Sequence, residues 1–147
     1  MNSFWIALLV VVAGGMALGL QAPVNSALSR AIGDGVTAAM VSFGVGFVAL
    51  AAVVAVRGSW PGFAALRLAP PWLFAGGLLG GFYVWSALSG VSRLGVVTMT
   101  AALILGQMLV AMLLDRFGAF GVPASAINWQ RLVAVALVGA GLVMSRL

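Results

Sequence analysis

Residues 4–30 have the sequence FWIALLVVVAGGMALGLQAPVNSALSR, an almost unbroken apolar run that ends at a single arginine. In a helix that rises 1.5 Å per residue, about 20 apolar residues cross the roughly 30 Å hydrocarbon core of a bilayer. The run is longer than that and carries no charge before Arg30. It also lacks the basic stretch that precedes the apolar core of a cleaved signal peptide. We therefore expect a retained membrane-spanning helix at about residues 4–29.

The same pattern recurs four more times along the chain. Further apolar runs cover about residues 36–56, 72–90, 95–114 and 130–146, and the seven basic and two acidic side chains lie between the runs or at their edges. A charge at the centre of a membrane helix costs roughly 2.5 to 3.5 kcal/mol, which explains these positions. The sequence therefore predicts an all-α integral membrane protein. We expect five transmembrane helices in a single transmembrane domain over residues 1–147, in which the last span is the shortest.

The composition excludes most kinds of chemistry. The chain has no Cys, His, Glu or Lys, so it can hardly assemble a thiolate site, the usual zinc ligands or a general acid–base pair. We expect no enzyme activity, no metal and no cofactor. The seven basic residues are all arginines that stand singly, without the basic stripe that follows a nucleic-acid backbone, so no nucleic-acid partner is expected.

The positions of the arginines bear on how the chain inserts into the membrane. Five spans place the termini on opposite sides, and we call the side of the N-terminus side A and the other side B. Side A carries Arg57, Arg67, Arg116 and Arg131, and side B carries Arg30, Arg93 and Arg146. Four arginines on side A against three on side B slightly favour one orientation, with side A in the cytoplasm. So small a difference also allows insertion both ways, in which case copies pair as an antiparallel dimer with the inverted-repeat architecture of many secondary transporters.

Tryptophans mark one edge of the predicted membrane region. Trp5, Trp60, Trp72 and Trp129 all fall at span ends on side A, where amphipathic indoles anchor to headgroups. Trp85 is the exception, because it lies well inside the third run.

Three amide side chains lie inside the predicted spans. The hydrocarbon core holds no water, so Gln21, Asn25 and Gln107 must face protein or a cavity. Gln21 and Asn25 share a helix face, and Pro23 between them leaves the carbonyl of Gly19 without its usual backbone donor. These features predict a bent polar segment at a binding site. Polar contacts that hold helices together are the alternative interpretation.

Polar side chains from four spans fall at matching depth. Counting along each run puts them in the half nearer side B, with Gln107 near the midplane, whereas the half nearer side A is almost purely aliphatic. We predict a cavity open toward side B. Its substrate-binding residues are expected to be Gln21, Asn25, Ser42, Tyr83, Trp85, Thr100 and Gln107.

The two carboxylates and one further amide have separate interpretations. Asp115 lies on the same helix face as Gln107 and is the candidate residue for ion coupling. An interfacial carboxylate beside Arg116 is the alternative. Asp34 is interpreted as a residue that stabilises a turn, and Asn128 as the cap of the fifth helix.

Several short motifs follow one another along the chain: Gly19-x-Gln21-x-x-x-Asn25-x-x-Leu28, Ser42-Phe43-x-x-Gly46, Gly76-Gly77-x-x-Gly80 with Tyr83, and Gly106-Gln107 followed by Asp115-x-Phe117-Gly118. In their order and spacing they resemble the half-size, five-helix YdcZ-type branch of the drug/metabolite transporter superfamily. The resemblance covers essentially the whole chain. It implies a multi-pass protein of the bacterial inner membrane that works as an antiparallel homodimer or with a sister chain.

The resemblance extends to the related small multidrug resistance proteins only in part. In those exporters a membrane-embedded Glu of the first helix exchanges protons for substrate. This chain has no Glu and offers the neutral amides of Gln21 and Asn25 instead.

We therefore expect a secondary transporter that moves a small metabolite or drug-like solute across the membrane by alternating access. A non-transporting membrane subunit that scaffolds a larger complex is the alternative. The substrate, the direction of transport and the coupling ion do not follow from the residues, because neutral amides, a phenol and an indole suit many solutes.

Overall fold

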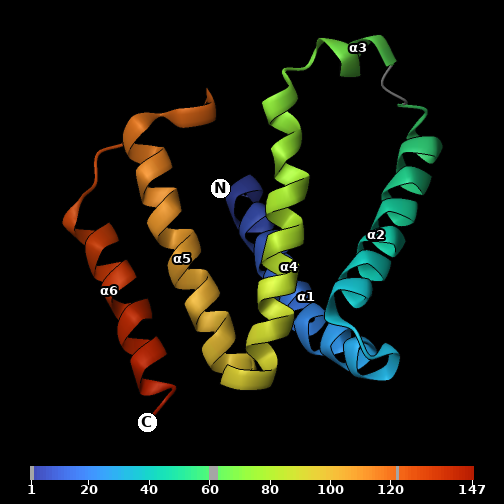
Figure 1. Ribbon diagram of the computed structural model, residues 1–147. Helices are drawn as coiled ribbons and strands as arrows, with labels where there is room; N and C mark the ends of the chain where they lie inside the picture. The colour runs from blue at the N-terminus through green and yellow to red at the C-terminus, as the bar shows by residue number, and fades with distance from the viewer. Residues whose placement is uncertain (1, 60–62, 122) are drawn as a thin grey trace. The chain divides into compact units, whose positions relative to one another are not determined.

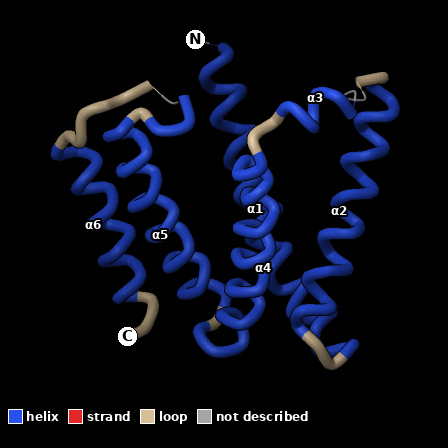
Figure 2. The backbone as a smooth tube through the Cα atoms, turned by 45° about the horizontal axis from the view of Figure 1, so that its top comes forward, coloured by secondary structure: helices blue, strands red, loops and turns tan. Residues whose placement is uncertain are grey.

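The computed structural model describes residues 2–59, 63–121 and 123–147. This part of the chain is almost entirely helical and contains no strand (Figures 1 and 2), which confirms the all-α prediction. In chain order its elements are α1 (Asn2–Ile32), α2 (Gly35–Arg57), α3 (Phe63–Leu68), η1 (Pro71–Phe74), α4 (Ala75–Leu94), α5 (Val96–Phe117), η2 (Ala119–Gly121) and α6 (Trp129–Met144).

Four helical segments are long and apolar enough to cross a membrane: Ser3–Ile32, Gly35–Arg57, Pro71–Leu94 and Val96–Phe117. The helix α6 is apolar but has only 16 residues, or about 24 Å at 1.5 Å per residue. It can span only if the flanking side chains reach the interfaces, as long arginine stems do. The described residues thus contain four candidate membrane spans and one shorter apolar helix, α6. That α6 also crosses the bilayer stays a prediction.

The helix ends differ from the predicted ends by one to four residues. For example, α4 ends at Leu94 where the apolar run ends near residue 90, and α5 ends at Phe117 where the run ends near residue 114. Hydropathy marks the part of a helix that suits lipid. Backbone hydrogen bonding continues beyond it into the polar ends, so each long helix extends past its apolar run at one end at least.

Short polar side chains start two of the helices; the Asn128 cap was predicted, whereas Asp34 had been interpreted as a turn residue. The Asp34 carboxylate accepts the Thr37 N–H at 2.6 Å at the start of α2, and the Asn128 side chain accepts the Arg131 N–H at 3.0 Å at the start of α6. Hydrogen bonds from the Thr37 hydroxyl and backbone N–H lower the pKa of Asp34 below its ordinary 3.8. Pro71 occupies the first turn of η1, where its missing N–H costs nothing.

The helix α1 continues through Pro23 without a break, so the predicted polar segment lies within one continuous helix. The gap between the second and third runs contains the short helix α3, which Figure 1 shows between α2 and α4. Among the predicted belt residues, Trp5, Trp72 and Trp129 are each more than half exposed. Trp60 lies outside the described residues.

The chain divides into two compact units, residues 1–92 and 93–147. The prediction of a single transmembrane domain stays a prediction. In the first unit α1 packs against α2, and α2 meets α4 through Ala39, Val84 and Leu88. The Phe43 ring lies against the backbone of α4 at Gly80. In the second unit α5 and α6 lie side by side and antiparallel (Figure 1).

The long helices carry much of their apolar surface on the outside. In α2, for example, Phe47 is 72% exposed and Leu50 is 69% exposed. Soluble monomers rarely present contiguous apolar surface on this scale, whereas lipid tails solvate it without cost. The buried core within one chain is correspondingly small.

Candidate functional site in the membrane helices

Buried polar side chains are few in the described part of the chain, and two of the three lie next to each other near the end of α1. Asn25 and Ser26 are each 5% exposed, and Thr98 in α5 is 6% exposed. Burial of a polar group is costly unless a hydrogen bond compensates for it. The partners of these three side chains therefore decide what each one does.

The Asn25 side chain makes no hydrogen bond to any residue that the structure describes, although 95% of the residue is buried. No fully enclosed side-chain nitrogen or oxygen in the described chain lacks a partner. The Asn25 amide therefore retains a small accessible area, through which water or a solute can reach it. An amide in this state has two N–H donors and an acceptor available.

The Ser26 side chain is hydrogen-bonded to a charged residue, Arg30. Its Oγ accepts a hydrogen bond from the Arg30 guanidinium, with 2.9 Å from Nη1 to Oγ. Arg30 lies one helical turn further along α1 and is exposed. The last two turns of α1 thus combine a free buried amide, a buried hydroxyl and an accessible cation.

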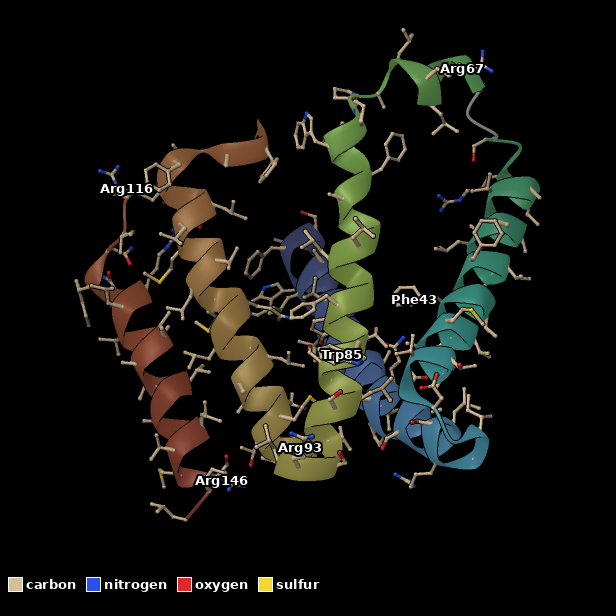
Figure 3. All side chains as sticks on the ribbon, in the orientation of Figure 1. Phe43, Arg67, Trp85, Arg93, Arg116 and Arg146 are labelled. Atoms are coloured by element: carbon tan, nitrogen blue, oxygen red, sulfur yellow. The ribbon has the colours of Figure 1, made fainter. Side chains whose placement is uncertain are left out.

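The other predicted site residues of the first unit differ in burial. Gln21, one turn before Asn25, is exposed, whereas Ser42 in α2 and Tyr83 in α4 are half-buried. Tyr83 packs against the small core between α2 and α4. Trp85 is 47% exposed, and Figure 3 shows it on α4. Its ring lies 6.0 Å from that of Phe82 on the same helix.

The predicted site residues of the second unit are all on α5. Thr100 is half-buried, and Gln107, halfway along the helix, is exposed. No hydrogen bond or ion pair in the described chain joins any two of the eight predicted binding and coupling residues. Within a single copy they form no hydrogen-bonded network.

Asp115 forms an ion pair with Arg131, not with its neighbour Arg116. Asp115 Oδ2 lies 2.8 Å from Arg131 Nη1, and both side chains are about one-third exposed. The Asp115 carbonyl also accepts the Ser125 N–H at 2.7 Å. Asp115 therefore joins the end of α5 to the following loop and to the start of α6.

A second polar contact joins α5 and α6 at their other ends. The Thr98 hydroxyl donates to the Ser145 carbonyl at 3.3 Å, and Ser145 Oγ lies 3.1 Å from Thr98 Oγ1. Thr98 is therefore a partnered, structural group. The hydroxyl contact and the Asp115 ion pair hold this helical hairpin at both ends.

An open apolar hollow of about 530 Å³ follows one face of α2. It is lined by Val41, Gly44, Val45, Val48 and Ala49. None of the predicted site residues lines it, and such a surface suits lipid tails or another helix. The hollow is therefore not part of the polar site.

Sequence reasoning did not assign a role to Ser26 or Arg30. The signal was present, because the two residues are four apart and thus share a helix face, and Ser26 directly follows Asn25. Arg30 had been counted only as a charge at a span end.

Comparisons with known proteins agree with this architecture. A family model described as "Putative inner membrane exporter, YdcZ" matches residues 6–144. The chain is 29% identical to inner membrane protein YdcZ of Escherichia coli (strain K12) over 143 residues, which cover 96% of each chain. No solved structure matches it. This description is that of an exporter family and not of an enzyme family, and the long apolar helices fit it, so the chain is a multi-pass inner-membrane protein that belongs to the YdcZ family.

Proposed function

We propose that the protein is half of a secondary transporter that pairs with an inverted copy of itself or with a sister chain. The pair moves a small metabolite or drug-like solute across the inner membrane by alternating access. Membership of a family described as inner-membrane exporters supports the class of activity. The substrate site lies at the contact between the two chains, as in transporters built from inverted repeats.

The observation that carries this proposal is the exposure of amides inside membrane spans. Gln21 in α1 and Gln107 in α5 are exposed and have no partner in the described chain. Gln21 and Gln107 belong to different compact units, so an exposed, unpartnered amide occurs independently in each unit. A lipid-facing carboxamide would leave its donors and acceptor unsatisfied, and a second protein chain or a wet cavity removes that cost.

Asn25 is the best candidate for direct contact with the solute, because its amide is buried, unpartnered and still accessible. Ser42, Tyr83 and Trp85 are proposed to add polar and aromatic groups in the same compact unit, and Thr100 is a proposed binding residue of the second unit. Asp115 is proposed as a coupling group only if its ion pair with Arg131 opens during the transport cycle.

Solute counterflow in proteoliposomes tests the function. Purified protein is reconstituted and loaded with each of a panel of unlabelled metabolites, and uptake of the labelled solute is measured at two pH values. We expect exchange of at least one solute. The variants Gln21→Ala, Asn25→Ala and Gln107→Ala should lose it while they keep their fold. Normal exchange in all three variants would show that the proposed site is wrong.

A further inference from the structure

The short helix α3 exposes apolar side chains although it lies outside the candidate membrane spans. It stands between the span that ends at Arg57 and the span that begins at Pro71. Leu68 is 84% exposed, and Leu66 is about half exposed. Exposure of such side chains to water is unfavourable, so α3 needs an apolar environment that the described part of the chain does not supply.

The connection to the next span keeps α3 at the membrane surface. Leu68 stands three residues before Pro71, the first residue of that span. A chain extends by at most about 3.6 Å per residue, so Leu68 lies within about 11 Å of the span end. The headgroup layer beyond the hydrocarbon core is about 5–8 Å thick on each side. The helix α3 therefore lies within reach of the boundary between headgroups and acyl chains.

The residues of α3 are arranged as the membrane surface requires. Successive side chains on an α-helix are about 100° apart. Leu66 and Leu68 therefore flank Ala65 on the side of α3 opposite Arg67. When Arg67 faces the headgroups, the apolar side chains face the lipid. The same segment belongs to one compact unit with α4, so this arrangement does not depend on the second unit.

Arg67 has a charge that no carboxylate neutralises. It is exposed, and within the described residues it forms no ion pair or hydrogen bond. Figure 3 shows its side chain on α3, directed away from α4. The sequence has no acidic residue between Asp34 and Asp115. A guanidinium has five N–H donors that match phosphate oxygens, and its charge favours a headgroup with a net negative charge.

We propose that α3 lies in the surface of the bilayer, with Leu66 and Leu68 at the outer ends of the acyl chains and Arg67 on the phosphate of an anionic phospholipid. A lipid surface fits better than a protein partner, because α3 directly adjoins a candidate span and its charge is complementary to anionic headgroups. This contact does not depend on the transport function proposed above.

A single cysteine with a polarity-sensitive dye measures the depth of α3. The chain has no Cys, so Leu68→Cys can be labelled without other changes. The labelled protein is placed in vesicles of phosphatidylcholine and phosphatidylglycerol that contain a lipid nitroxide, either near the headgroup or near the end of the acyl chain. We expect emission at shorter wavelength than that of the free dye–cysteine adduct, with stronger quenching by the shallow nitroxide.

Phe47→Cys, near the middle of α2, is the reference for a deep position, and the deep nitroxide should quench it more strongly. If the Leu68→Cys label emits like the free adduct and neither nitroxide quenches it, α3 lies in water and the proposal is wrong. Stronger quenching of Leu68→Cys by the deep nitroxide would also overturn it, because α3 would then lie inside the hydrocarbon.

The lipid preference is measured with the same label. Shallow nitroxides on phosphatidylglycerol and on phosphatidylcholine are compared at equal mole fraction. We expect phosphatidylglycerol to quench more strongly, with a local enrichment of up to about fivefold for one arginine. Arg67→Gln should remove this difference, and Arg67→Lys should retain most of it. Arg93→Gln, in the last turn of α4 and thus at the other end of that helix, should leave it unchanged.

Three results would overturn the lipid assignment. The first is equal quenching by the two lipids in the protein with Arg67, and the second is a preference that persists in Arg67→Gln. The third concerns a protein partner. If the label on Leu68→Cys is shielded from water and from both nitroxides, and oxidation of the unlabelled variant links two copies through a disulfide, a second copy of the chain covers α3.

Discussion

At the scale of single residues, Asn25 and Asn128 are two asparagines with opposite roles. Asn128 accepts a backbone N–H and starts α6, whereas Asn25 is buried without a partner. We predict that Asn25→Leu leaves thermal stability in detergent unchanged or raises it, because the Asn25 side chain makes no hydrogen bond to the rest of the described chain. The same variant should abolish counterflow, because it removes the group that meets the solute.

Asn128→Leu is the matched control. Loss of the helix cap should lower stability by about 1 kcal/mol and leave counterflow unchanged. Unfolding curves and exchange rates of the two variants check both statements. A loss of stability in Asn25→Leu comparable to that in Asn128→Leu would contradict the assignment, because it would mean that Asn25 supports the fold.

At the scale of elements, the α5–α6 hairpin is held at both ends by polar contacts. The Asp115–Arg131 pair joins the end of α5 to the start of α6. Since both side chains are about one-third exposed, we predict that Arg131→Met lowers stability by no more than about 1 kcal/mol. Arg116→Met should cause no loss, because Arg116 has no partner in the described chain. Thermal unfolding in detergent measures both changes.

The same pair tests the proposed coupling role of Asp115. If Asp115 binds the coupling ion, Asp115→Asn abolishes the dependence of counterflow on pH, and Arg131→Met shifts that dependence. If both variants exchange solute with the wild-type pH profile, the pair is a structural contact only.

At the scale of the whole molecule, the exposed amides predict association. We expect two chains per particle in mild detergent, as measured by light scattering. Gln107→Leu should weaken this association, because the amide then no longer satisfies its partner across the contact. Leu109, two residues along and thus on the opposite face of α5, provides the control, and Leu109→Ala should leave the dimer intact. Unchanged association of Gln107→Leu would remove Gln107 from the contact.

Much of this molecule follows from composition and spacing. The apolar runs between isolated arginines predict the long helices, and Asn128 was correctly predicted to cap a helix, whereas Asp34, interpreted as a turn residue, caps α2. These features are local, because hydropathy and capping act within one or two helical turns. The resemblance carried by the glycine, glutamine and asparagine motifs was confirmed by the family match over residues 6–144.

The sequence by itself determined that the chain is a helical membrane protein and which side chains are polar within it. Only the tertiary structure decided what those polar groups do. It pairs Asp115 with Arg131, joins Thr98 to Ser145 and Arg30 to Ser26, and leaves the mostly buried Asn25 side chain without a hydrogen-bond partner in the described chain. The physical reason is that hydropathy depends on each residue alone, whereas satisfaction of a buried polar group depends on which other helix lies within about 3 Å of it.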